Sequence, residues 1–248
     1  MKNLEKYMNR VLVAGQKGFI GSYIWKKKGS EWIGVDLKDN EDVWDAQVNG
    51  RCDAVVLLAA NLKHNANMYR HNLRIYYWIT MLAEMAPDAH VIFTSSAAVY
   101  DDSTIPAKEG DERIAPTLYG KSKRLGEDII RDTLDNYTIL RLSNVYGRGS
   151  GNGVIDKFRK GEKKIYGDGE NIRDYISVDK VRSVIQKILE DPKKYNQQVY
   201  NISSGKGMTV NEAFKKYGKG KPKYEKARTY DVKCSILNNT KAKRDGLL

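Results

Sequence analysis

A tyrosine and a lysine one helical turn apart have the spacing that proton transfer needs. Tyr119 and Lys123 enclose the sequence YGKSK. On a helix, residues i and i+4 share a face, so both side chains would point the same way. A free phenol has a pKa of about 10 and is a poor base at neutral pH, but a nearby positive charge favours the phenolate. The pair indicates acid–base chemistry, although alone it is equally typical of a surface helix that starts with a tyrosine.

A second group of residues could hold a phosphate. Gly15, Gly18 and Gly21 follow a short apolar run and open an expected helix, which is the context that a dinucleotide-binding glycine motif requires. Glycine allows close backbone approach, and a helix N-terminus presents N–H groups to a pyrophosphate. Asp36 ends the next apolar run, where a carboxylate can accept hydrogen bonds from ribose hydroxyls and repel a 2′-phosphate. The pattern favours NAD over NADP as cofactor, a preference that Lys38 weakens.

Hydroxyl groups end another apolar run. The segment 90–94 reads HVIFT, and Ser95 and Ser96 follow it directly. The carboxyl ends of parallel strands form the ligand-binding edge of an open α/β sheet. A serine at this edge could hold a substrate oxygen and share its proton with Tyr119. Taken alone, Ser96 is more typical of a cap at the end of a strand.

Positioning these groups requires alternating strands and helices. Apolar runs predict strands over 10–14, 31–36, 53–58, 90–94, 138–142 and 199–202. Helical patterns run from the glycine motif to about residue 28 and over 72–85, 118–134, 154–160, 178–189 and 209–216, the last opening with a capping pattern. We expect loops over most of 146–169, and the sequence beyond 219 has only weak periodicity. The alternation predicts an α/β fold with a doubly wound parallel sheet of the Rossmann type.

The length of the chain limits its organisation. Its 248 residues suffice for one such core and a small appended subdomain. We expect a dinucleotide-binding core over 1–147 and 176–204, and a substrate-binding subdomain over 148–175 and 205–248. No apolar run approaches the roughly 20 residues that span a bilayer, and the N-terminus is polar. We therefore expect a cytoplasmic protein without a membrane partner.

The formal net charge of +12 could indicate a nucleic-acid surface. The lysines are scattered along the chain without interleaved aromatic residues, so we expect no nucleic-acid partner, and a phosphate-bearing small substrate would suit a basic protein equally well. Cys52 and Cys234 form neither a disulfide framework nor a zinc site, and the three histidines lack the spacing of metal ligands. We expect no metal.

In chain order, these motifs resemble the extended short-chain dehydrogenase/reductase family, in its NAD-dependent epimerase/dehydratase branch. Beyond the glycine motif, the acidic residue and YGKSK, the similar segments read DAVVLLAA over 53–60, SSAAVY over 95–100, LRLSNVYG over 140–147, GDGENIRDYISVD over 167–179 and YNISSG over 200–205. Near the end, RTYDV over 228–232 is similar to the family's segment with an arginine and a DV pair. The resemblance spans nearly the whole chain.

The resemblance implies a role for each motif. Tyr119 would be the catalytic base and acid, Lys123 would hold the nicotinamide ribose and lower the pKa of the tyrosine, and Ser96 would bind the reacting sugar hydroxyl. The residues implied to hold the dinucleotide are Gly15, Gly18, Phe19, Ile20, Gly21, Asp36, Leu58, Ala59, Ala60, Asn72, Lys123 and Ser143. The residues implied to grip the nucleotide diphosphate of the substrate, with arginines suited to bidentate phosphate recognition, are Asn144, Arg173 and Arg228.

The activity implied is that of an NAD-dependent nucleotide-sugar epimerase, acting at C4 through a transient 4-keto sugar. Two alternatives remain. An NAD(P)H-dependent reductase of nucleotide 4-keto sugars would use the same residues, and a catalytically silent dinucleotide-binding protein would use the glycine motif alone. Members of the family often dimerise through the helices that follow Asn72 and Tyr119, so we expect a homodimer.

The chain also departs from the family pattern. The stretch between Asp36 and Asp53 is too short for a complete strand–helix unit, which leaves the adenine pocket undefined. Asp101 stands where the family usually has glycine. A 4,6-dehydratase would carry an Asp–Glu pair where Ala97 follows Ser96, which argues against dehydration. The substrate-binding portion is shorter than usual, so the sugar is not specified.

Overall fold

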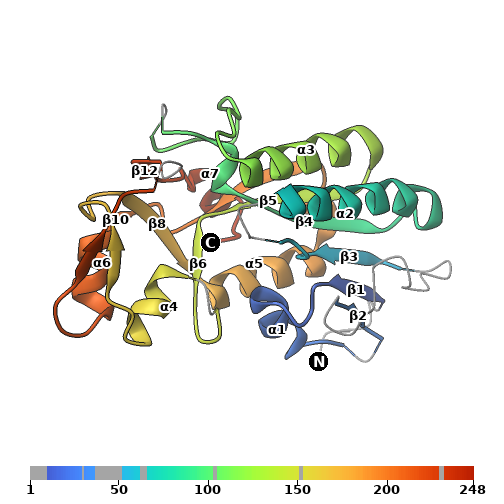
Figure 1. The fold of residues 1–248 in the computed structure, drawn as a ribbon. Coiled ribbons are helices and arrows are strands. Elements are labelled where there is room, and N and C mark those ends of the chain that lie inside the picture. The colour runs from blue at the N-terminus through green and yellow to red at the C-terminus, as the bar shows by residue number, and fades with distance from the viewer. Residues whose placement is uncertain are drawn as a thin grey trace.

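A six-stranded parallel sheet forms the centre of the molecule (Figure 1). The computed structural model of the chain describes residues 10–29, 31–36, 52–61, 66–102, 105–150, 153–228 and 232–248. The sheet contains β1 (Val11–Ala14), β2 (Ile33–Val35), β3 (Ala54–Leu57), β4 (His90–Ser96), β5 (Tyr137–Leu142) and β9 (Gln198–Ile202). Their order is β2-β1-β3-β4-β5-β9, and every neighbouring pair is parallel. The predicted α/β fold with a Rossmann-type sheet is confirmed.

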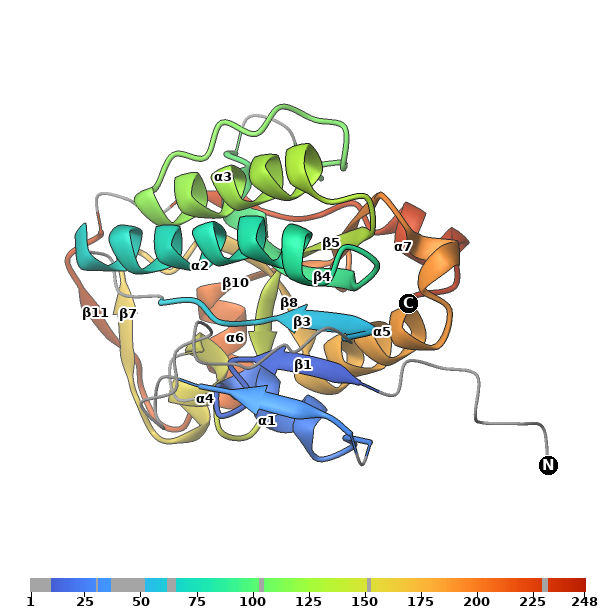
Figure 2. The same ribbon diagram turned by 90° about the vertical axis from the view of Figure 1, so that its right-hand side faces the viewer.

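Helices cover both faces of this sheet (Figure 2). One face carries α2 (Ala66–Met85) and α3 (Leu118–Thr133), which pack side by side. The opposite face carries α1 (Phe19–Trp25) and α5 (Val178–Glu190). Right-handed crossovers between parallel strands place successive helices in this way. The carboxyl ends of the strands therefore share one edge, where ligands bind in such sheets.

The first strand shows how the core is divided. Val11 and Val13 lie in the core shared with α5, whereas Leu12 and Ala14 lie in the core shared with α2. All four side chains are buried. Strands that are buried on both faces read as continuous apolar runs. The central strands could be predicted from the sequence for this reason.

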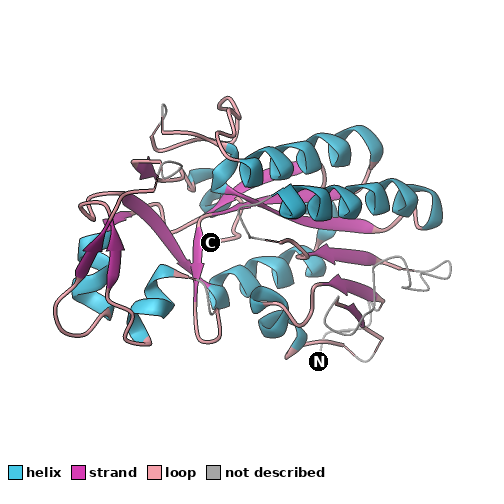
Figure 3. Ribbon diagram, viewed as in Figure 1, coloured by secondary structure: helices cyan, strands magenta, loops and turns pink. Residues whose placement is uncertain are grey.

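A smaller unit lies beside the main sheet (Figure 3). One of its sheets contains β6 (Asn144–Tyr146), β8 (Ile172–Ser177), β10 (Gly207–Thr209) and β12 (Cys234–Ser235), and β8 pairs with each of the other three strands. A second sheet consists of the pair β7 (Lys164–Tyr166) and β11 (Lys223–Glu225). Two helices, α4 (Val154–Arg159) and α6 (Val210–Tyr217), pack together around a core that includes Phe158 and Phe214. Thr209 and Glu212 form the capping box that the sequence predicted at the start of α6.

Some elements differ from the sequence prediction. The stretch 146–169, expected to be mostly loop, contains β7, and the region beyond 219 contains β11, β12 and α7 (Thr240–Arg244). Each of these elements has two to five residues. Strands this short depend on pairing with distant partners rather than on their own pattern. The helix expected from Asn72 begins earlier, at Ala66.

The C-terminal helix packs with the main sheet. α7 contacts β9, and Ala242 and Leu247 lie in the main hydrophobic core.

The division of the chain into 1–147 with 176–204 and 148–175 with 205–248 stays a prediction. Most of the short stretch between Asp36 and Asp53, including Lys38, falls outside the described residues. Within the described ranges, no helix is long and apolar enough to cross a membrane.

Candidate active site

Ser96 and Tyr119, the two residues expected to share a proton, lie close enough for the Ser96 side chain to lower the pKa of the tyrosine. Ser96 ends β4 at the ligand-binding edge of the sheet. Its Oγ accepts a hydrogen bond of 3.2 Å from the backbone N–H of Ala98, in the short 3-10 helix η4 (Ala97–Val99). Tyr119 lies in the first turn of α3. Two elements that are distant in the sequence therefore bring these hydroxyl groups together.

A glycine that the sequence analysis did not single out permits this approach. Gly120 is buried in the first turn of α3, and a Cβ placed on it would lie 2.1 Å from the carbonyl oxygen of Ala98. The turn that carries Tyr119 therefore packs directly on η4. The signal in the sequence is a glycine inside an expected helix, where it costs about 1 kcal/mol relative to alanine and so indicates a packing requirement.

The phenol of Tyr119 is held in its neutral form. Desolvation by the surrounding protein raises the pKa of Tyr119 to about 12, against the opposing effect of the Ser96 side chain. Such a phenol acts as a base near neutral pH only when a positive charge comes close to its oxygen. Lys123 Nζ lies 6.0 Å from the centroid of the Tyr119 ring. The expected lowering of the tyrosine pKa by Lys123 stays a prediction.

Lys123 is buried one helical turn after Tyr119. Its exposed fraction is 2%, and its Nζ donates a hydrogen bond of 2.8 Å to the carbonyl oxygen of Thr94. The same ammonium lies 4.8 Å from the centroid of the Phe93 ring. Burial lowers the pKa of Lys123 to about 8, and the negative charge of Glu127 opposes this effect. A buried lysine with so perturbed a pKa is typical of a functional site.

The glycine motif forms a tight loop between β1 and α1. Gly15 adopts a φ of +92°, which favours glycine over other residues. A Cβ on Gly21 would lie 2.1 Å from the carbonyl oxygen of Gly15, so the helix packs against its own loop. Gly18 caps the helix, and Phe19 and Ile20 begin it. The backbone of the loop is thereby open to the close approach of a ligand.

The other residues predicted to hold the dinucleotide lie around this loop. Asp36 follows β2, and its Oδ2 accepts a hydrogen bond of 2.8 Å from the backbone N–H of Lys17. Leu58, Ala59 and Ala60 follow β3, the strand beside β1. These residues therefore come from neighbouring strand ends, as a ligand at the edge of the sheet requires.

Asn72 and Ser143 differ in their contacts. Asn72 Oδ1 accepts a hydrogen bond of 2.9 Å from the backbone N–H of Asn61, and its Nδ2 donates one of 3.1 Å to Ser122 Oγ. Asn72 thus joins the loop after β3 to α3. Ser143 Oγ is buried and has no hydrogen-bond partner among the described residues.

A buried hydroxyl without a partner is costly, so Ser143 indicates a polar ligand. The same holds for Gln16 Oε1 in the glycine loop, which also has no hydrogen-bond partner within the described part of the chain. These orphaned atoms and the tight glycine loop fit a bound dinucleotide, although they do not distinguish NAD from NADP.

The three residues predicted to grip the substrate belong to the smaller unit. Asn144 lies on β6, which pairs with β8, and its Nδ2 donates a hydrogen bond of 3.0 Å to the carbonyl oxygen of Asp174. Arg173 lies on β8. Arg228 follows β11, and its guanidinium stacks 3.7 Å from the centroid of the Tyr166 ring on β7. The structure places Asn144 and Arg173 on paired strands, whereas Arg228 belongs to the other strand pair.

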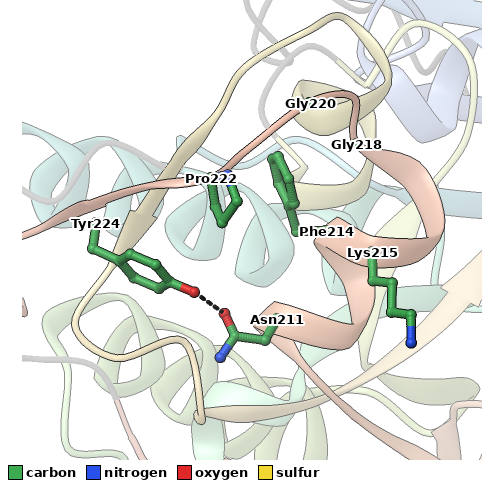
Figure 4. Close-up of a pocket in the computed structure, with 7 residues that line it drawn as sticks. All are labelled: Asn211, Phe214, Lys215, Gly218, Gly220, Pro222 and Tyr224. Carbon is green, nitrogen blue, oxygen red and sulfur yellow. Dashed lines mark hydrogen bonds between the residues drawn. The ribbon is translucent and has the colours of Figure 1, made fainter.

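A hollow of about 470 Å³ lies between α6 and β11 (Figure 4). It is lined by Asn211, Phe214, Lys215, Gly218, Gly220, Pro222 and Tyr224. Across it, the hydroxyl of Tyr224 donates a hydrogen bond of 3.1 Å to Asn211 Oδ1. None of the predicted site residues lines this hollow. We therefore place the chemistry at the edge of the main sheet instead.

Comparison with known proteins gives a consistent result. The sequence model of the NAD dependent epimerase/dehydratase family matches residues 11–203. A putative UDP-glucose 4-epimerase of Methanocaldococcus jannaschii is 28% identical over 288 aligned residues, which cover 95% of this chain and 92% of that protein.

Solved structures of similar proteins have the same fold. The UDP-N-acetylglucosamine 4-epimerase from Methanobrevibacter ruminantium M1, in complex with UDP-N-acetylmuramic acid, superposes with a TM-score of 0.82 at 25% identity, over 97% of this chain and 92% of that one. The UDP-glucose 4-epimerase from Thermotoga maritima, with UDP-glucose, gives a TM-score of 0.78 at 27% identity, over 95% and 91%. Because the family match covers most of the chain, this protein belongs to the NAD-dependent epimerase/dehydratase family of extended short-chain dehydrogenases/reductases.

Proposed function

We propose that the chain is an NAD-dependent epimerase that inverts C4 of a nucleotide-linked sugar. Membership of the family makes it an NAD-dependent enzyme of the epimerase/dehydratase type. The observation that carries the finer proposal is the neighbouring pair Ser96 and Tyr119, with the buried ammonium of Lys123 6.0 Å from the centroid of the Tyr119 ring. The similar proteins named above are 4-epimerases of UDP-sugars, which supports a UDP-sugar as the substrate.

The proposed chemistry starts with a proton. NAD, when bound, supplies the hydride acceptor and a positive charge close to Tyr119. Ser96 Oγ would hold the C4 hydroxyl, and the Tyr119 oxygen would take its proton as the C4–H bond gives up hydride. The 4-keto sugar would then turn over, receive the hydride on its other face and recover the proton from Tyr119. Oxidation and reduction cancel, so the reaction consumes no cofactor.

The nucleotide diphosphate must stay bound while the sugar turns. We assign this task to Asn144, Arg173 and Arg228, because all three lie on the smaller unit rather than at the proton-transfer site. Stacking on Tyr166 fixes the plane of the Arg228 guanidinium. A guanidinium in a fixed plane suits bidentate binding to a phosphate.

Asp36 belongs to the proposed cofactor site. We assign it to the ribose of the adenosine, since its carboxylate lies at the glycine loop and would repel a 2′-phosphate. NAD is therefore the proposed cofactor rather than NADP. The remaining residues of the predicted dinucleotide site keep the roles that the family resemblance implies.

Dehydration and a catalytically silent role are less consistent with the site. Ala97 and Ala98 occupy the turn directly after Ser96, where dehydration would need a carboxylic acid. A silent dinucleotide-binding protein would have no use for a buried lysine whose pKa is lowered by desolvation, as it is for Lys123. A 4-keto-sugar reductase would use the same residues, and it differs by consuming its reduced cofactor.

We also propose that two copies associate through α2 and α3. The helices pack side by side, and they expose large hydrophobic side chains, with exposed fractions of 61% for Tyr77, 44% for Met85 and 49% for Leu118. Burial of these side chains between two copies would stabilise a dimer. A homodimer would give twice the chain mass of 28.2 kDa in light scattering, and a monomer at micromolar concentration would contradict the proposal.

The function is tested by incubating the purified protein, without added cofactor, with UDP-, dTDP-, GDP- and CDP-sugars. Proton NMR would show a new C4 epimer from at least one of them, most directly from a UDP-sugar. Unchanged spectra for the whole panel, both alone and after addition of NAD, would contradict the epimerase. Turnover restricted to 4-keto sugars with NADH or NADPH would establish the reductase instead.

A further inference from the structure

Glu127 is a buried carboxylate that the proposed proton transfer does not use. It follows Tyr119 and Lys123 on α3 at the same interval of four residues, so the three share one face of the helix. Its side chain is 0% exposed. A buried carboxylate is stable only when hydrogen bonds and positive charges compensate for its lost hydration.

Two strands supply the hydrogen bonds. Ser95, the residue beside Ser96 on β4, donates from its Oγ to Glu127 Oε1 at 2.6 Å. Arg141 on β5 donates to both carboxylate oxygens, from Nε to Oε1 at 2.9 Å and from Nη2 to Oε2 at 2.7 Å. Glu127 therefore joins α3 to the end of β4, next to Ser96 in the chain, and to β5.

The same carboxylate is surrounded by positive charge. Arg113, in the loop before α3, donates to Glu127 Oε2 at 3.2 Å, and Arg131 Nη2 lies 3.7 Å from the same oxygen. Burial by itself would raise the pKa of Glu127, but the hydrogen bond and the charge of Arg141 outweigh burial and lower it. Glu127 is therefore ionised throughout the neutral and alkaline range.

The groups that face Lys123 come from three elements. Tyr119 and Glu127 lie on its own helix, the Phe93 ring and the Thr94 carbonyl lie on β4, and Tyr76 on α2 packs against both Phe93 and Gly126 of α3. Desolvation raises the pKa of Tyr76 above its usual range, so this phenol stays neutral. Of these groups, Glu127 carries the negative charge that raises the pKa of Lys123.

We propose that Glu127 is a positioning residue, which fixes the end of β4 beside Ser96 through Ser95 and holds Lys123 in its charged form. Its effect on turnover rests on the proposed function, whereas its effect on the charge of Lys123 does not. If the carboxylate lost its charge, Lys123 would release its proton at lower pH, and the hydrogen bond from Ser95, the neighbour of Ser96, would weaken.

The test needs a variant that removes this charge without leaving its partner unpaired. Glu127→Gln alone would strand the buried Arg141 guanidinium, at a cost of about 3–5 kcal/mol. The double variant Glu127→Gln with Arg141→Gln removes both charges. The titration of Lys123 is followed by NMR of ¹³Cε-labelled lysine, with the signal assigned by its absence from Lys123→Arg.

The proposal predicts that Lys123 in the double variant titrates below the wild-type pKa of about 8. We express kcat/KM of each protein as a fraction of its own plateau at low pH. If the pKa of Lys123 falls by about one unit, this fraction would drop about fivefold at pH 8. At pH 6 it would stay within about 10% of the wild-type fraction. If Glu127 had a purely structural role, the double variant would be less active at every pH. The pH at which kcat/KM declines on the alkaline side would then be unchanged.

Two variants serve as controls. Asp128→Asn removes the adjacent carboxylate of α3, which pairs with Arg113 at 2.6 Å, and it should leave the titration of Lys123 unchanged. Glu127→Asp keeps the negative charge. Its kcat/KM should therefore decline at an alkaline pH closer to that of the wild type than to that of the double variant. An equal shift in Asp128→Asn would show an unspecific effect of net charge and would overturn the proposal.

An unshifted Lys123 titration in the folded double variant would also overturn the proposal. If that variant does not fold, the wild type provides the test. The ¹³Cδ chemical shift of Glu127 should show a small step near pH 8, where Lys123 loses its charge. A chemical shift that stays constant through this pH range would overturn the proposal. A shifted Lys123 titration in a protein that converts no nucleotide sugar would contradict the proposed function and leave this inference in place.

Discussion

Replacing Tyr119 with phenylalanine removes a single oxygen from the site. The proposed mechanism requires that oxygen for proton transfer, which typically contributes about 10²- to 10⁴-fold to the rate, so Tyr119→Phe should lower kcat at least about 100-fold. The affinity for NAD, measured by calorimetry, should stay unchanged, because the predicted cofactor contacts lie elsewhere. Tyr224→Phe is the control, since Tyr224 lies at the hollow outside the site. Turnover of Tyr119→Phe within threefold of the wild type would exclude Tyr119 as the base.

The buried charge of Lys123 makes stability depend on pH. Its pKa falls from an ordinary 10.5 to about 8 on folding, a difference of about 3 kcal/mol. Because the folded state binds the proton less tightly than the unfolded state, this penalty is fully present below pH 8 and disappears as the pH rises to 10.5. Relative to Lys123→Met, the wild type should gain about 3 kcal/mol of unfolding free energy across that window. Urea denaturation at pH 7 and pH 10.5 measures the difference, and a constant gap between the two proteins would contradict the perturbed lysine.

Local sequence patterns identify part of the site. Tyr119 and Lys123 lie within one helical turn, and the glycines lie within one loop, so their relation is fixed by spacing alone. The bond from Ser95 to Glu127 and the bidentate contact of Arg141 link different elements. Such contacts depend on how strands and helices pack, and no local pattern predicts them.

At the scale of elements, the contact between α3 and η4 sets the geometry of the site. Gly120→Ala would place a Cβ 2.1 Å from the carbonyl oxygen of Ala98, which forces the two elements apart. A shift of about 1 Å at a reacting group can lower the rate about 100-fold, so kcat should fall by about that factor while the fold is kept. Gly110→Ala is the matched control, because a Cβ there would meet nothing within 4 Å. Equal activity of the two variants would show that the contact does not position Tyr119.

The elements themselves were predictable to different degrees. The central strands are apolar on both faces, and the long helices have a clear apolar stripe, so both leave a pattern in the sequence. β6, β7, β10, β11 and β12 have two or three residues each. Which of their residues are buried depends on pairing partners far along the chain, which explains why the sequence predicts the two helices of the smaller unit but not these short strands.

At the scale of the whole molecule, the two units divide the proposed work. The edge of the main sheet carries Ser96, Tyr119 and Lys123, and the smaller unit carries Asn144, Arg173 and Arg228. Proton transfer requires a rigid site, whereas a sugar that turns over needs room and a separate anchor for its nucleotide. Holding the reacting group and the nucleotide from different units satisfies both requirements.

The most direct test of the central claim follows the hydrogen at C4. A UDP-sugar that the protein converts is labelled with deuterium at C4 and incubated in ordinary water without added cofactor. The proposed mechanism predicts that the C4 epimer keeps its deuterium, because hydride leaves and returns within one bound complex while Tyr119 handles the hydroxyl proton. Loss of the label from C4, measured by mass spectrometry of the product, would contradict an epimerisation by oxidation and reduction at that carbon.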